Sequence, residues 1–360
     1  MRTHYFNPGY EASIERNITQ YTPPKMVQRL RIDLQTLPLY YANHEDNVFI
    51  SSPLPSSFTH PKMFFSKDAI SDLSPWGWAP ELLGIFRSIN APYPTEDMKY
   101  LASRKRSIDF WKLIEQEIVF PSFFQEPIAI SECPILQDDN WVIKEEFSSS
   151  GRGITTIFAT QNINKIIKAR RERDKWQSIE PYYPITKEMG YEFVRTTNGE
   201  IKYLGKHIAI VCNNTYVGSK IGAIDEDILE TTYPSEKDYI SALTKALFSL
   251  PLKNYAGIIG IDTGIIHIAN ASYIIPSLEI NIRPTMGYVA LQLQKKYLSK
   301  GQKGQFIITR KQDCILKQVK CGEPLYLMGK VESLAPGLYP LTPILKDTQF
   351  VACLSISNVF

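Results

Sequence analysis

The sequence has few of the features that mark disulfide-rich, zinc-binding, nucleic-acid-binding or secreted proteins. It contains 5 cysteines in 360 residues and no Cys-x-x-Cys pair, so we expect free thiols rather than a zinc knuckle or a disulfide framework. Charge of one sign is also scarce, because 40 Lys and Arg residues oppose 37 Asp and Glu residues. The net charge of +3 gives no reason to expect nucleic acid or an anionic membrane as a partner. The first residues lack the apolar core of a signal peptide.

Long apolar runs are equally scarce. The most apolar stretch, residues 255–276, contains Asp262, His267 and an Asn-Ala-Ser turn, so two buried strands explain it better than a membrane span. We therefore expect a soluble, cytoplasmic protein without a membrane partner. The sequence leaves the oligomeric state open.

The composition that remains is typical of a folded protein with more than one compact part. Hydrophobic residues make up 44% and charged residues 21%, and the length favours two or three subdomains. Periodicity predicts one helix from about 95 through 117, a hairpin of strands at 141–147 and 154–159, and a turn at Asn198-Gly199. The same signals predict helices at 25–37, 81–89, 162–176, 235–250 and 288–298, and strands at 47–50, 305–309, 323–328 and 349–356.

Three oxygen-bearing side chains lie in otherwise apolar predicted strands. Glu279 and Asn281 are two residues apart, so they point to the same face of a strand, and Asp262 lies on the preceding strand across a hairpin. Hard cations such as Mg²⁺ prefer an all-oxygen set of this kind and usually share it with substrate phosphates. Arg283, two residues further on, is suited to phosphate. The spacing equally allows a structural cluster in which Arg283 neutralises Glu279.

The hairpin at 141–159 carries a second set of phosphate-binding features. Lys144 lies on an apolar strand, where its ammonium can hold a phosphate as a point charge. The tip contains Gly151, Arg152 and Gly153, whose flexible backbone can close over phosphates, although a plain turn is the simpler explanation of such a tip taken alone. Neither GxxxxGK[ST] nor GxGxxG occurs, which excludes a Walker A loop and a Rossmann fingerprint.

The order and spacing of these segments resemble a known superfamily. KEEFSSSGRGI, IEPYY, YEFV and GIDTGII…SLEINIRPTMG together look like the ATP-grasp superfamily, which includes D-alanine–D-alanine ligase, biotin carboxylase and glutathione synthetase. The resemblance covers residues 139–298, and its most specific part is the E-x-N-x-R segment preceded by a strand with an Asp. It implies an ATP-grasp fold, of the α+β or α/β class, in which two α+β subdomains clamp ATP.

The resemblance also implies a division of the chain. Residues 1–93 would form a preceding α/β N-terminal domain, which matches the superfamily only in outline. Residues 94–300 would form the ATP-grasp domain, with a glycine-hairpin subdomain at about 139–182 and a metal-binding subdomain at about 183–300. Residues 301–360 would add C-terminal strands to this core.

Individual roles follow from the resemblance, position by position. Lys144 matches the strand lysine that contacts nucleotide phosphates, and Gly151, Arg152 and Gly153 match the mobile loop over the triphosphate. Glu180, together with the backbone of Ile179 and Pro181, falls at the hinge segment that contacts adenine and ribose.

The remaining roles concern the metal and the transferred group. Asp262, Glu279 and Asn281 match ligands of Mg²⁺, with Mn²⁺ as the alternative ion, and Arg283 matches an arginine near the transferred phosphoryl group. Lys144 and Arg283 are therefore the predicted catalytic residues. Arg104, Lys105 and Arg106 precede the nucleotide lysine, where the superfamily often supplies a phosphate or carboxylate contact; a surface location is the alternative.

The activity implied is that of an ATP-dependent, ADP-forming ligase that makes a carbon–nitrogen bond. A small carboxylate would be activated as an acyl phosphate and attacked by an amine or a similar nucleophile. Two alternatives remain open: a phosphotransferase on the same fold, and a nucleotide-binding protein without catalysis. The sequence identifies neither the carboxylate nor the nucleophile.

Overall fold

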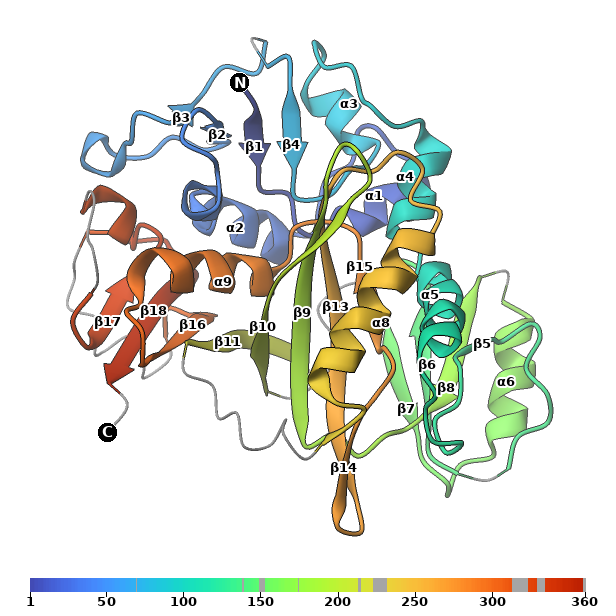
Figure 1. Cartoon of the computed structure of the whole chain (residues 1–360). Coiled ribbons are helices and arrows are strands. Elements are labelled where there is room, and N and C mark those ends of the chain that lie inside the picture. The colour runs from blue at the N-terminus through green and yellow to red at the C-terminus, as the bar shows by residue number, and fades with distance from the viewer. Residues whose placement is uncertain are drawn as a thin grey trace. The chain divides into compact units, whose positions relative to one another are not determined.

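The computed structural model describes the greater part of the chain, as a mixed arrangement of helices and sheets (Figure 1). The described residues are 1–68, 70–137, 139–148, 153–173, 175–212, 215–222, 232–312, 323–328 and 334–358. They belong to two compact units, each built from separate stretches of sequence. The first unit comprises Met1–Lys99, Lys206–Ile224 and Arg283–Phe360, and the second comprises Tyr100–Gly205 and Asp225–Ile282. The domain limits expected from the sequence stay predictions.

The first unit begins with a small parallel sheet and its helices. The four strands are ordered β3-β2-β1-β4, with bounds β1 Thr3–Tyr5, β2 Asn47–Phe49, β3 Met63–Phe64 and β4 Leu73–Pro75. The accompanying helices are α1 Glu11–Arg16, α2 Lys25–Asp33, α3 Glu81–Ile85 and the 3-10 helices η1 Leu37–Tyr40 and η2 Ser56–Phe58. In the core, Tyr5, Phe49 and Phe86 meet edge to face with ring centroids 5.1 to 5.7 Å apart. This geometry is favourable for aromatic side chains and fixes α3 against the sheet.

Antiparallel strands and helix α9 (Met286–Tyr297) form a further part of the first unit. Four of these strands are neighbours in the order β11-β16-β18-β17. Their bounds are β11 Thr215–Gly222, β16 Gln302–Arg310, β17 Gly337–Pro340 and β18 Phe350–Asn358. Helix α9 begins at Thr285, whose hydroxyl accepts a hydrogen bond from the Tyr288 N–H. β10 (Ile201–Cys212) runs from the second unit into the first.

The strand expected at 323–328 is wrong. This segment forms the 3-10 helix η4 (Leu325–Leu327) instead. Pro324 precedes it with φ of −55° and has no N–H to give to a ladder, and the Tyr326 N–H donates to the Tyr40 hydroxyl at 3.3 Å. The short strand β17, which follows Pro336 and ends at Pro340, was not expected.

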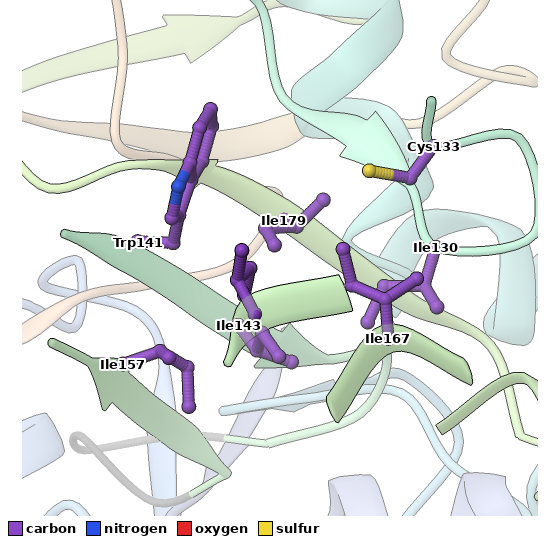
Figure 2. Close-up of a cluster of buried hydrophobic side chains, with 8 residues drawn as sticks. Ile130, Cys133, Trp141, Ile143, Ile157, Ile167 and Ile179 are labelled. Atoms are coloured by element: carbon purple, nitrogen blue, oxygen red, sulfur yellow. The ribbon is translucent and has the colours of Figure 1, made fainter. Parts of the chain in front are cut away.

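The second unit contains a four-stranded sheet with one face covered by a helix. The strands follow the order β5-β8-β6-β7, with bounds β5 Ile128–Ala129, β6 Trp141–Glu145, β7 Ile154–Ile157 and β8 Gln177–Pro181. Helix α6 (Ile163–Arg171) supplies Ile163 and Ile167 to the core on that face, where they meet Trp141, Ile143 and Ile179 (Figure 2). Since side chains alternate along a strand, residues 144 and 180 must point to the opposite face.

The second sheet of this unit contains the strands of the metal prediction. Its bounds are β9 Lys187–Arg195, β12 Thr232–Tyr233, β13 Gly257–Ile268, β14 Ala271–Ile274 and β15 Glu279–Asn281. β13 pairs with β9 on one side and, in succession along the other side, with β14 and β15. Helix α8 (Glu236–Ser249) begins at Ser235, whose hydroxyl accepts from the Asp238 N–H at 3.2 Å, as the capping-box pattern predicts.

The single helix expected over 95–117 is also wrong. The chain forms two helices, α4 (Thr95–Ala102) and α5 (Lys105–Glu117), separated at Ser103 and Arg104. At the break, the Arg104 N–H donates to the Glu146 carbonyl at 3.2 Å instead of continuing the helix. The Ser103 hydroxyl donates to the Glu146 carboxylate at 2.7 Å. Among the described residues, no helix is long and apolar enough to cross a membrane.

Candidate functional site

Lys144 and Glu180 form a buried ion pair on the face of the small sheet away from α6. Val142 and Glu180 are directly opposite each other in the β6–β8 ladder, which places Lys144 one step along the same face. The Lys144 Nζ lies 2.5 Å from Glu180 Oε1 and donates to the Leu278 carbonyl at 2.8 Å. The lysine therefore joins β8 to the backbone immediately before Glu279.

Burial governs the charge state of Glu180. Removal from water raises the pKa of this carboxyl, and the neighbouring Lys144 ammonium and Arg104 guanidinium oppose that rise, whereas the Glu279 carboxylate adds to it. The ionised form of Glu180 therefore depends on the cations beside it. Two carboxylates and two cations of the second unit consequently share one electrostatic environment.

The three predicted metal ligands lie together on one face of the second sheet. Asp262 and Glu279 are directly opposite in the antiparallel β13–β15 ladder, so their side chains emerge on the same face. Asn281, two residues along β15, shares that face, and its Nδ2 donates to Asp262 Oδ2 at 2.9 Å. The two carboxylates and the amide therefore lie on one face of two paired strands, as the sequence interpretation requires.

Arg104 binds the carboxylate of Glu279. Its Nε and Nη2 donate to Glu279 Oε1 and Oε2 at 3.2 and 3.0 Å, a bidentate contact. Its Nη1 donates to the Glu145 carbonyl at 2.8 Å and to the Ser148 hydroxyl. The arginine side chain is only 5% exposed, whereas that of Glu279 is 22% exposed. The sequence did not distinguish Arg104 from the adjacent Lys105 and Arg106. The structure does, because Arg104 lies at the break between α4 and α5 and contacts Glu279.

The other two basic residues of that segment point elsewhere. The Lys105 ammonium lies 3.3 Å from the Glu146 carboxylate and is half exposed. Arg106 pairs with Asp109 at 3.0 Å, and its guanidinium stacks over the Tyr100 ring at 3.6 Å from the centroid.

The glycine hairpin is described only at its base. Gly151 and Arg152 lie outside the described residues, and their predicted contacts stay predictions. Gly153 has φ of +67°, and a Cβ there would lie 2.8 Å from the Ser148 hydroxyl oxygen, so this position favours glycine. The Glu145 N–H donates to the Gly153 carbonyl at 2.9 Å and closes the base of the hairpin.

The predicted hinge residues lie on β8. The Ile179 side chain is fully buried in the core against α6, so only its backbone is left for a ligand (Figure 2). Pro181 is opposite Trp141 at the end of β8. On the other side of β8, the ladder with β5 stops at Ile179, because Pro127 comes before β5 and has no N–H.

Arg283 falls in the first unit, unlike the other predicted site residues. Its Nη1 donates to the carbonyl of Pro284 at 3.0 Å. Its proposed relation to the phosphoryl group stays a prediction.

The donor set fits a hard divalent cation. Among the described residues, no group of three or more His, Cys, Asp and Glu side chains could hold a metal ion. The set of Asp262, Glu279 and Asn281 has two carboxylates and an amide, and sites for Mg²⁺ commonly complete such a small protein set with water and phosphate oxygens.

Comparison with known proteins gives structural matches alone. No family model matches the sequence, and no curated protein matches it. The structure is similar to N5-carboxyaminoimidazole synthetase from Staphylococcus aureus complexed with ADP, with a TM-score of 0.52 and 13% identity over 99% of this chain and 93% of that one. The same enzyme from Aspergillus clavatus, in complex with ADP and 5-aminoimidazole ribonucleotide, has a TM-score of 0.52 and 9% identity over 100% and 94%. An ATP-grasp superfamily protein from Archaeoglobus fulgidus has a TM-score of 0.50 and 11% identity over the whole of both chains.

Proposed function

Because this chain has the ATP-grasp fold, we propose that it is an ATP-dependent, ADP-forming ligase that activates a small carboxylate as an acyl phosphate for attack by an amine or a similar nucleophile. The observation that carries the proposal is the meeting of Asp262, Glu279 and Asn281 on one face of β13 and β15, with Lys144 bound to the carbonyl of Leu278 beside them. Two similar structures contain ADP, which supports nucleotide use.

The nucleotide would lie against the small sheet of the second unit. The face that carries Lys144 and Glu180 is opposite the face covered by α6, so it is not used by the hydrophobic core. Lys144 would give its charge to the phosphates, and Glu180 would accept from a ribose hydroxyl. The backbone of Ile179, at the last pair of the β5–β8 ladder, and that of Pro181, where β8 extends beyond β5, would contact the base. Gly153 and the predicted tip residues Gly151 and Arg152 would approach the triphosphate.

The predicted cations would be held by oxygens of the second sheet. Asp262, Glu279 and Asn281 would bind Mg²⁺ or Mn²⁺, which neutralises charge that builds up on the transferred phosphoryl group. The contribution of the protein is to hold these oxygens in one orientation: the β13–β15 ladder fixes the strands, and the hydrogen bond from Asn281 fixes Asp262.

The reaction needs alignment and charge neutralisation rather than a protein nucleophile. A carboxylate oxygen of the substrate attacks the γ-phosphorus, the bond to the β,γ-bridging oxygen breaks, and ADP leaves. The nucleophile then attacks the acyl carbon, loses its proton and expels phosphate, so that one ATP yields one ADP and one phosphate. Lys144 and Arg283 would stabilise the charge on the transferred group.

Product analysis tests this function against the two alternatives. Purified protein is incubated with Mg²⁺-ATP, carboxylates and amines, singly and in pairs, and ADP, phosphate and organic products are quantified. A ligase forms ADP and phosphate in equal amounts with a joined product only when both acceptors are present. A phosphorylated product that is stable with a single acceptor would favour a phosphotransferase, and nucleotide binding without turnover over the whole screen would favour a non-catalytic protein.

A further inference from the structure

The contact between Arg104 and Glu279 bears directly on how the proposed metal site is filled. The guanidinium edge engages both oxygens of the carboxylate, at 3.2 and 3.0 Å. A cation that chelates Glu279 through both oxygens needs the lone pairs that the guanidinium occupies, and the fixed positive charge of the arginine repels it. Arginine and metal therefore compete for one carboxylate.

Arg104 also holds the base of the hairpin. Its Nη1 donates to the Glu145 carbonyl and to the Ser148 hydroxyl, and its backbone N–H donates to the Glu146 carbonyl. The neighbouring Ser103 hydroxyl donates to the Glu146 carboxylate at 2.7 Å. The almost fully buried side chain of Arg104, at the break between α4 and α5, thus connects β15 to the segment that follows β6.

We infer that Arg104 is a positioning residue that takes the place of the divalent cation on Glu279 until nucleotide and metal arrive, and that metal binding exchanges this ion pair for a metal–carboxylate contact. The inference rests on the proposed function. In the absence of metal, Arg104 keeps Glu279 oriented beside Asp262 and Asn281 and lowers the repulsion between the two carboxylates. When a cation takes Glu279, the contacts of Arg104 with Glu145 and Ser148 are no longer tied to β15, so metal occupancy is coupled to the base of the hairpin.

The exchange predicts an unusual gain of function on removal of the arginine. In Arg104→Gln, Glu279 loses the bidentate contact with the guanidinium. The nucleotide-free protein should therefore bind Mn²⁺ about tenfold more tightly than wild type, because this charge-assisted contact no longer competes. The variant should melt lower than wild type in chelator, and saturating Mn²⁺ should raise its melting temperature by about 3 °C more than it raises that of wild type. Lys105→Ala is the matched control, because it removes the half-exposed partner of Glu146 from the same segment and should respond to Mn²⁺ as wild type does.

Electron paramagnetic resonance titration of Mn²⁺ and thermal melts, both without nucleotide, provide the readouts. Tighter Mn²⁺ binding and metal-dependent recovery of stability in Arg104→Gln, absent in Lys105→Ala, support the exchange. If Mn²⁺ does not restore the melting temperature of Arg104→Gln, the arginine has a purely structural role and the inference is overturned. Wild type is also titrated with Mn²⁺ in the presence of an ATP analogue. If wild type binds Mn²⁺ with the analogue but Arg104→Gln shows no increase in Mn²⁺ affinity without nucleotide, the exchange alone is rejected. If wild type binds no Mn²⁺ with the analogue, the proposed function itself is rejected.

Discussion

Each compact unit contains a bidentate ion pair between an arginine and a glutamate, and the two pairs differ in their surroundings. In the first unit, Arg31 donates to Glu81 at 3.0 and 3.1 Å, and the carboxylate also accepts from Asn7 at 3.0 Å. The Glu81 side chain is 0% exposed. In the second unit, Arg104 makes an equivalent contact with Glu279, whose side chain is 22% exposed.

The difference separates a pair that serves the fold from one that we propose to act in the chemistry. Around Glu81, every described contact connects parts of the fold: Arg31 also donates to the Pro8 carbonyl, and Asn7 bonds to the backbone of Gly77. Around Glu279, the neighbours are an opposing carboxylate, Asp262, and the Lys144 ammonium bound to the preceding carbonyl. A buried and fully enclosed pair serves the fold, whereas a pair with an accessible carboxylate beside other ionisable groups is suited to bind a ligand.

The largest expected effect is the loss of turnover in Glu279→Gln. The substitution keeps the shape of the side chain but removes the negative charge that would hold the cation, so ADP formation should fall about 1,000-fold or more. Rates of ADP release with the acceptors found in the product screen provide the measurement. Glu126→Gln, at a half-exposed glutamate of the same unit, is the control and should retain activity. Wild-type turnover in Glu279→Gln would remove the metal assignment.

The equivalent change in the first unit should act on stability instead. Glu81→Gln leaves the buried Arg31 guanidinium without a carboxylate, and the free energy of unfolding of that unit should fall by about 3 kcal/mol. Urea denaturation followed by tryptophan fluorescence measures the loss, and ATP titration of the folded variant should give a dissociation constant close to that of wild type. An unchanged unfolding midpoint would show that the enclosed pair is not structural.

A smaller effect is expected on nucleotide affinity when Lys144 is removed. Lys144→Ala should weaken ATP binding about 10-fold to 100-fold, because a charge-assisted contact with the phosphates is lost. The variant also leaves Glu180 buried without its ammonium partner, so Lys144→Met combined with Glu180→Gln is the second variant, in which no buried charge is left over. Calorimetric titration gives the affinities. Equal affinity in wild type and Lys144→Ala would refute the phosphate role of this lysine.

An effect of similar size is expected when the intact protein binds its ligand. Mg²⁺-ATP at about 100 times its dissociation constant should stabilise the folded state by about 2.7 kcal/mol, which raises the melting temperature by several degrees. Differential scanning fluorimetry with and without chelator provides the measurement. Glu81→Gln should show the same ligand-dependent shift from a lower starting temperature, whereas Glu279→Gln should show a reduced one. No shift in wild type at saturation would indicate a site that no longer binds nucleotide.

Sequence reasoning predicted the ATP-grasp fold correctly, and the structural matches confirm it. The pattern around Glu279 and Asn281 could be interpreted because side chains two apart on a strand share a face, and pairing opposite Asp262 required only a short hairpin. The residue predictions themselves await experiment.

What the sequence did not specify depends on contacts distant along the chain. At the break between α4 and α5, Ser103 and Arg104 bond to Glu146, more than 40 residues away. The local signal is weak: the Ser103 hydroxyl accepts from the Lys105 N–H at 3.2 Å, and neither Gly nor Pro is present. The ion pair between Arg104 and Glu279 could not be predicted either, because the two residues are 175 positions apart in the sequence. At 323–328, local apolar character predicted a strand, but Pro324 and the hydrogen bond between Tyr326 and Tyr40 produced a 3-10 helix.

The most direct test of the account counts divalent cations bound beside the triphosphate. Wild type and Glu279→Gln are each saturated with a non-hydrolysable ATP analogue and titrated with Mn²⁺, and slowly tumbling Mn²⁺ is quantified by electron paramagnetic resonance. We predict that wild type immobilises the metal at the site of Asp262, Glu279 and Asn281, and that the variant loses this bound population while it still binds the analogue. Identical Mn²⁺ stoichiometry and affinity in the two proteins would contradict the account.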